Sequence, residues 1–178
     1  MKHLTFLSLL VALVLTSCGG DDSIPPGQEQ RAYDVVFSGI TVGANYNVTT
    51  PSQSKRLDEV LSSSNKDKVP YVKEATIQYG ESWVLIEGLK QGESLAGLTF
   101  NLLDGQAIAG TVSLGRIEAG VDGAPVKNST NNFLTFLNTV ATNLAAKKSM
   151  TLQITLNGGD KDVTNLKITV HTTAIFKW

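Results

Sequence analysis

From Tyr33 to the C-terminus, apolar and polar residues alternate in short runs rich in Val, Ile, Thr and aromatic residues. Because successive side chains of a strand point to opposite faces, this pattern predicts strands with one buried and one solvated face. The predicted strands cover residues 35–42, 46–50, 72–79, 83–86, 98–103, 107–114, 150–156 and 166–170. The run at 83–86 is apolar on both faces, which is typical of a strand inside a sheet.

Turn signals separate several of these runs. Asp104-Gly105 lies between two of them, and this dipeptide suits the type I′ turn of a hairpin. The glycine pair Gly158-Gly159 predicts a second hairpin, between the last two strands. Pro51 interrupts the chain, and the polar stretch 62–68 is expected to be a loop.

Two segments follow a helical period instead. In 131–148, apolar residues recur at three- and four-residue steps, which predicts one long amphipathic helix. These residues are Phe133, Phe136, Leu137, Val140, Ala141 and Leu144. A shorter pattern at 54–62 predicts a short helix, with Leu57, Val60 and Leu61 on one side.

The order of these elements decides the fold class. Strands follow one another through tight turns, without a regular alternation of strand and helix. This order favours a mostly β fold, an antiparallel β-sandwich, over a doubly wound α/β fold. We expect the long helix to lie across an open end or one face of the sandwich.

The N-terminal segment differs from the rest of the chain. Met1-Lys2-His3 is basic, the run from Leu4 to Leu15 is apolar, and Thr16 and Ser17 are small. This succession has the anatomy of a secretory signal peptide, and its apolar run is shorter than the roughly 20 residues of a membrane span. The sequence therefore predicts an exported protein.

The end of this segment resembles the lipobox of bacterial lipoproteins, in the quartet Leu15-Thr16-Ser17-Cys18. The resemblance implies that Cys18 is lipidated, becomes the mature N-terminus and attaches the chain to a membrane. Asp21-Asp22 is similar to the acidic signal that follows the anchor cysteine in surface-exposed lipoproteins of the Bacteroidetes. It implies an outer-membrane lipoprotein on the cell surface, with the periplasm-facing side as the alternative.

Three regions follow from these observations. Residues 1–17 are expected to be the lipoprotein signal peptide. Residues 18–32 contain almost no side chains to bury and are expected to form the lipidated cysteine and a flexible tether. Residues 33–178 are expected to fold as a single β-sandwich domain.

Composition excludes several classes of protein. The formal net charge is −1, and no basic stripe of the kind found in nucleic-acid-binding proteins is present. Cys18 is the sole cysteine, so the domain has no disulfide framework, cysteine nucleophile or cysteine metal site. Neither a P-loop nor a dinucleotide-binding glycine motif occurs. We therefore expect no cofactor and no nucleic-acid partner.

Candidate catalytic and metal-binding residues are few. His171 is the only histidine after the signal peptide, and its phase predicts a solvated position opposite Ile168 and Val170. A carboxylate-dependent hydrolase needs two acids about 5–10 Å apart, and Glu87 is the acid to inspect because it interrupts an apolar strand. The Asp160-x-Asp162 step lacks the other oxygen ligands of a calcium loop. We expect no catalytic and no metal site.

Aromatic residues and the long helix are candidate binding elements. Tyr79 and Trp83 lie in predicted strands and are expected in the core rather than on a sugar-binding platform. For Trp178, at the end of the chain, the pattern leaves both a core position and an exposed position open. Helix 131–148 is expected to cover the core of the domain, with a lipid pocket beneath it or a bound partner as the alternatives.

Two hypotheses about function are favoured over a hydrolase. The first is a non-enzymatic, lipid-anchored binding module for a glycan, a lipid or another envelope protein. The second is a structural or assembly subunit of a surface complex or fimbria-like fibre. A concave aromatic or apolar pocket favours the first, whereas an exposed strand edge favours assembly by strand addition.

Overall fold

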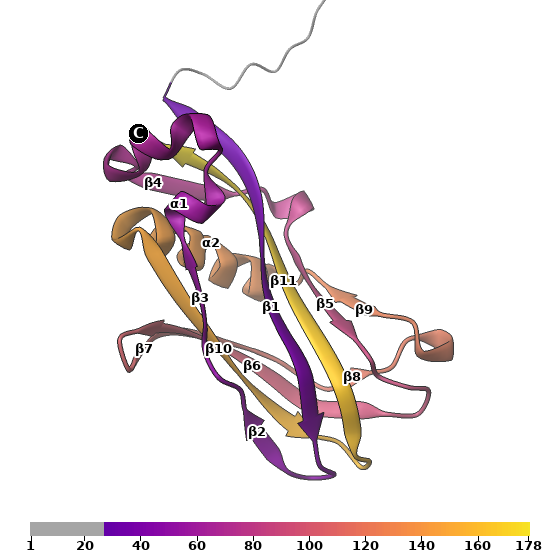
Figure 1. Ribbon diagram of the computed structural model, residues 1–178. Coiled ribbons are helices and arrows are strands. Elements are labelled where there is room, and N and C mark those ends of the chain that lie inside the picture. Colours follow the sequence, from indigo (N-terminus) through magenta and orange to yellow (C-terminus); the bar gives the residue numbers. More distant parts are fainter. Residues whose placement is uncertain (1–26) are drawn as a thin grey trace, which may run out of the picture.

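The computed structural model describes residues 27–178, which form two antiparallel sheets with one long helix (Figure 1). Sheet A has the order β1-β11-β5-β9, and β4 also pairs with β11. Sheet B has the order β2-β10-β6-β7, where β3 pairs with β10 and β8 pairs with β6. The mostly β, antiparallel sandwich predicted from the alternating pattern is therefore confirmed.

The strands differ greatly in length. Sheet A contains β1 (Gln28–Val42), β4 (Glu74–Ile77), β5 (Trp83–Glu87), β9 (Val126–Asn128) and β11 (Val163–Lys177). Sheet B contains β2 (Asn47–Thr49), β3 (Gln53–Arg56), β6 (Ser94–Asp104), β7 (Ala107–Leu114), β8 (Ile117–Glu118) and β10 (Ser149–Gly158). The short strands β3, β8 and β9 were not expected, because so few residues carry no readable alternation.

The helical segments are α1 (Leu57–Val60), α2 (Asn131–Lys147) and 3₁₀ helices at Ser63–Tyr71, Tyr79–Glu81 and Val121–Gly123. Helix α2 confirms the predicted long helix, and its apolar residues are buried. It contacts β4 and β11 of sheet A and β7 and β10 of sheet B, so it lies between the two sheets. The rings of Phe133 and Phe136 lie 5.2 and 6.4 Å from that of Phe100 on β6. The side chain of Lys148, just past the helix, donates to the carbonyl of Ala145 at 2.6 Å. The apolar face of α2 is thus packed into the core of the domain.

The short predicted helix at 54–62 is only partly correct. Residues 53–56 are extended because they pair with β10, from Gln53 opposite Leu152 to Arg56 opposite Ser149. The helix begins at Leu57 and ends at Val60, and both of these side chains are buried. The stretch expected as a loop after Ser62 forms a 3₁₀ helix from Ser63 to Tyr71.

The predicted boundary between tether and domain also changes. Strand β1 begins at Gln28, so residues 28–32 belong to the sandwich rather than to the tether. They pair with the end of β11, from Gln28 opposite Lys177 to Ala32 opposite Thr173. Their polar composition hid this strand, since only Glu29 among them is buried.

The connection between β10 and β11 is not the predicted hairpin. Strand β10 belongs to sheet B and β11 to sheet A, so the segment around Gly158-Gly159 passes from one sheet to the other. The backbone of this crossing packs against the loop that follows β1, where Gly158 N donates to Tyr46 O at 2.8 Å and Asn45 N to Gly159 O at 2.9 Å. The hairpin at Asp104-Gly105 is confirmed as the turn between β6 and β7.

Both ends of the described chain lie at one end of the sandwich (Figure 1). Trp178 N donates to Gly27 O at 2.7 Å, which holds the C-terminus beside the start of β1. The side chain of Trp178 is partly buried and packs against the core. The predicted signal peptide, the predicted lipidation site Cys18 and the acidic pair Asp21-Asp22 lie outside the described residues.

Candidate functional site

The edges of the two sheets are protected by different means, with one exception. A free strand edge exposes unpaired backbone groups, and proteins block such edges with charges, proline, bulges, shortness or a covering element. In sheet A, β1 carries Arg31 and Asp34 and is irregular between Phe37 and Ile40. Strand β9 has three residues and includes Lys127.

A helix covers the edge of β4. The side chain of Asn138 on α2 accepts from Ile77 N at 3.2 Å, and Thr142 donates to Ala75 O at 3.4 Å. In sheet B, the edge formed by β2 and β3 is divided by Pro51 and carries Lys55 and Arg56. Strand β8, which pairs with β6 beyond the end of β7, has only two residues and carries Glu118. These features leave β7 as the remaining edge within residues 27–178.

Strand β7 has neither a charge nor a proline along its eight residues, Ala107–Leu114. It pairs with β6 on one side, and none of the strands described in 27–178 pairs with its other side. One irregularity lies near Ala109, and pairing is regular from Gly110 to Leu114. Ile108 exposes 63% of its surface, which is high for an isoleucine. The strand therefore presents an uncharged free edge.

An open groove of about 460 Å³ runs between β7 and α2. Its lining consists of residues 110–113 of β7 together with Asn132, Thr135, Phe136 and Thr139 of α2. No lining residue is charged. An extended segment placed along β7 would thus meet an uncharged surface beneath it.

The outer face of sheet B continues this uncharged surface in three rows, which we call the hydroxyl rungs. Opposite residues of antiparallel strands share a face, so each rung crosses the sheet. The rungs are Thr49-Thr155-Thr99-Ser113, Gln153-Asn101-Thr111 and Ser54-Thr151-Leu103-Ile108, of which the third ends in two apolar residues. Neighbouring side chains bond across them, as in Thr99 with Ser113 at 2.8 Å and Thr111 with Asn101 at 3.0 Å.

The outer face of sheet A carries a stack of four side chains from four adjacent strands. The Nδ1 atom of His171 lies 2.6 Å from Oδ1 of Asp34, and its ring stacks on Trp83 at 4.6 Å. The Nζ atom of Lys127 lies 5.0 Å from the centre of the Trp83 ring. Since β5 lies between β11 and β9, His171 and Lys127 flank the indole from both sides.

The structure corrects two expectations about aromatic residues. Trp83 is not in the core but on the outer face, half-buried by its neighbours on β11 and β9. Its ring is flanked by His171 and Lys127 and is not a free platform for a sugar. Tyr79 also lies outside the core, because the strand ends at Ile77 and Tyr79 begins a 3₁₀ helix with 52% of its surface exposed.

The acids considered for hydrolysis and for a metal site pair with neighbouring groups of the chain. Glu87 faces outward, and its carboxylate lies 2.8 Å from Nζ of Lys167 on the neighbouring strand. Asp162 accepts from Ala44 N at 2.7 Å and so ties the crossing segment to the loop after β1. Within residues 27–178, no three His, Cys, Asp or Glu side chains gather as a metal site would require.

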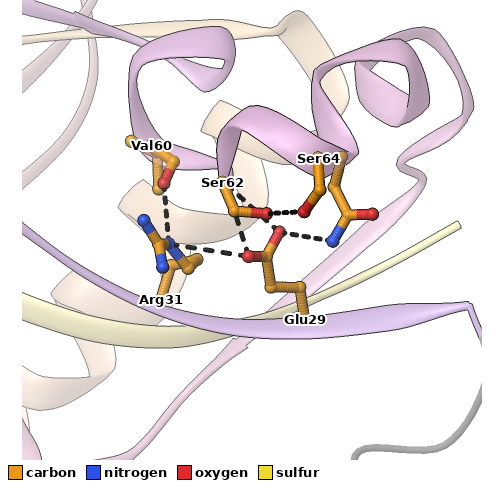
Figure 2. Close-up of polar contacts among 6 residues, drawn as sticks. Glu29, Arg31, Val60, Ser62 and Ser64 are labelled. Carbon is orange, nitrogen blue, oxygen red and sulfur yellow. Dashed lines mark hydrogen bonds and ion pairs between the residues drawn. The ribbon is translucent and has the colours of Figure 1, made fainter.

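A buried carboxylate that the sequence did not reveal lies at the start of β1 (Figure 2). Glu29 exposes 9% of its surface and accepts from Ser62 N at 3.3 Å and from Asn65 Nδ2 at 3.1 Å. Arg31 Nε lies 3.7 Å from the same carboxylate and donates to Val60 O at 3.1 Å. These contacts hold the 3₁₀ helix against β1, which is a structural role.

Tyr33 and Thr172 are opposite each other in β1 and β11, and the hydroxyl groups of both are buried. Burial raises the pKa of the Tyr33 phenol above its usual value of 10.0. At pH values above 10.0, the Tyr33 phenol of the unfolded chain releases its proton, whereas the buried phenol of the folded chain retains it. The unfolded state then binds fewer protons, so the free energy of unfolding falls as pH rises.

Replacing Tyr33 by phenylalanine is therefore expected to protect the fold at alkaline pH. The wild type should lose about 1.4 kcal/mol per pH unit above the unfolded pKa, and the variant should lose less. Urea unfolding at about pH 7 and about pH 11 measures the difference, with the exposed Tyr46→Phe as the control. If the free energy of unfolding falls equally between the two pH values in the wild type and in Tyr33→Phe, the role assigned to the phenol is contradicted.

No protein-family model and no curated protein matches this chain. Among solved structures, the chain is similar to that of Desmodium yellow mottle tymovirus, at 9% identity and a TM-score of 0.38, covering 86% of this chain and 90% of the other. The decameric BFDV capsid protein gives 8% identity and the same TM-score of 0.38, covering 85% and 98%. Likenesses at this TM-score support no inference about function.

No helix between Gly27 and Trp178 has the length and apolar content needed to cross a bilayer.

Proposed function

We propose that this chain is a non-enzymatic, lipid-anchored protein of the bacterial cell envelope that joins a protein assembly by strand addition at β7. The observation that carries the proposal is the free edge of β7, which lacks charge and proline where the other edges are blocked or covered. An extended segment of another chain would bond to its backbone groups, as in other cases of β-augmentation.

A glycan or lipid ligand has less support. The indole of Trp83 is flanked by His171 and Lys127, and the apolar residues of α2 are packed into the core. An envelope protein, which was one of the three ligand classes expected from the sequence, fits an uncharged strand edge best.

The proposed anchor is Cys18, with Asp21-Asp22 directing the protein to the cell surface. Strand β1 begins at Gln28, at the end of the sandwich that also holds the C-terminus (Figure 1). An anchor preceding β1 would place this end nearest the membrane, and the crossing between β10 and β11 farthest from it.

Protease treatment of intact cells and acyl labelling test the anchor. Cys18→Ser is expected to abolish incorporation of labelled palmitate and release the protein from membranes. An Asp21→Asn, Asp22→Asn chain should keep its label but become protected from protease until the outer membrane is opened. Undiminished labelling of Cys18→Ser would contradict the anchor, and equal digestion of the acidic variant would contradict the surface signal.

Site-specific photo-crosslinking in intact envelopes tests strand addition. A photoreactive residue at Ser113 is expected to give discrete protein crosslinks, because it lies beside the free edge of β7. The matched control is Thr49, which lies in the same hydroxyl rung at the opposite edge and should give few. Strand addition at β7 is refuted if Ser113 gives none, or if both positions crosslink equally.

A further inference from the structure

The surroundings of β7 define the segment that can pair with it. On the inner side, an added strand would lie over the groove, beside half-buried Val112 and buried Phe136. On the outer side, it would continue the hydroxyl rungs that end at Ser113 and Thr111. The site therefore suits an uncharged strand with an apolar residue facing inward between two small hydroxyl residues facing outward.

Strand β7 itself has this pattern in Thr111-Val112-Ser113. We infer that the segment added to β7 is β7 of a second copy of this chain, antiparallel and related by a two-fold axis at Val112. The inference rests on the proposed strand addition and names its partner. Two-fold dimers are self-complementary, so each residue contact occurs twice.

The two-fold axis fixes the register of the pairing. Val112 would lie opposite Val112 of the second copy, and Thr111 opposite the second copy's Ser113. Two hydroxyls would then meet across the new boundary, as Thr99 and Ser113 do within the chain at 2.8 Å. The first hydroxyl rung would continue into the second rung of the other copy. The outer faces of the two copies of sheet B would then form one uncharged face.

Neighbouring registers fit less well. A shift by one residue would place outward hydroxyls opposite inward apolar residues, because strand side chains alternate between faces. A pairing centred near Ala109 would include the irregular part of β7, whereas Gly110 to Leu114 pair regularly with β6. The axis at Val112 lies at the middle of that regular segment.

Cysteine crosslinking of the full-length chain in membranes measures this register directly. Opposite Cα atoms of antiparallel strands lie about 4.5–5.5 Å apart, within the 4.4–6.8 Å that a disulfide spans. Val112→Cys is therefore expected to form a disulfide-linked dimer with itself. The wild type, whose only cysteine is Cys18, measures the background.

A mixed experiment separates this register from its alternatives. Two tagged chains, one with Thr111→Cys and one with Ser113→Cys, are expected to crosslink to each other. Neither should crosslink to itself, because like positions would be about 8 Å apart and a disulfide needs less than about 7 Å. Self-crosslinks of either variant, or no mixed dimer, would overturn the register.

The photo-crosslinks from Ser113 distinguish failure of this inference from failure of the proposed function. A product with twice the mass of the chain supports the second copy. A product that contains a different envelope protein keeps strand addition but overturns the second copy. No product overturns both.

Discussion

Replacing Phe133 by alanine is expected to lower the free energy of unfolding by about 3–5 kcal/mol. Phe133 is fully buried on α2, and its ring lies 5.2 Å from that of Phe100 on β6. Removing the ring takes away apolar contacts and leaves a cavity between helix and sheet, which the packed surroundings can fill only in part. The effect should be the largest of any single truncation in α2.

Urea unfolding followed by circular dichroism measures this change. The control is Thr139→Ala, on the exposed side of the same helix, where the hydroxyl only bonds back to Thr135 O. This control is expected to change stability by less than about 0.5 kcal/mol. A loss of under about 1 kcal/mol in Phe133→Ala would show that α2 does not close the core as described.

Replacing Gly158 by alanine is expected to cost about 3 kcal/mol, at the upper end of the usual range for overpacking. A Cβ atom at this position would overlap the carbonyl oxygen of Gly43, which is backbone and cannot turn aside. The loop after β1 would have to move, which would break the bonds that Gly158 N and Asn45 N make across the crossing.

The matched control is Gly115→Ala, because a Cβ atom there meets nothing within 4 Å. It should leave stability unchanged or raise it slightly, since alanine reduces the entropy of the unfolded chain. Comparison of the two midpoints in urea isolates the effect of the close approach. Equal midpoints would contradict the packing of the crossing against the loop.

Local patterns were sufficient for the elements whose partners are close in sequence. The turn at Asp104-Gly105 and the helix that begins at Asn131 were predicted because each depends on residues within one segment. The crossing at Gly158-Gly159 was misread as a hairpin because the same turn residues serve whether the next strand joins the same sheet or the opposite one. Only the long-range pairing of β11 with β1 shows that the strand after the glycine pair joins the opposite sheet.

The candidate site could not be predicted from local patterns either. The composition of β7 is visible in the sequence, but its position at a sheet edge depends on strand order. Trp83 was assigned to the core because its strand is apolar on both faces, whereas neighbouring side chains shield it on the outer face. Glu29 gave no signal, since a single acid in a polar segment does not reveal burial.

Hydrogen exchange at the amides of β7 tests strand addition most directly. The full-length chain is compared in native membranes and at high dilution in detergent, where partners dissociate. Strand addition predicts that the amides of 110–114 that point away from β6, about every second one, exchange at least about tenfold more slowly in membranes, a difference of about 1.4 kcal/mol. The amides of β2 at the opposite edge should not change. Equal exchange of the β7 amides under both conditions would contradict strand addition.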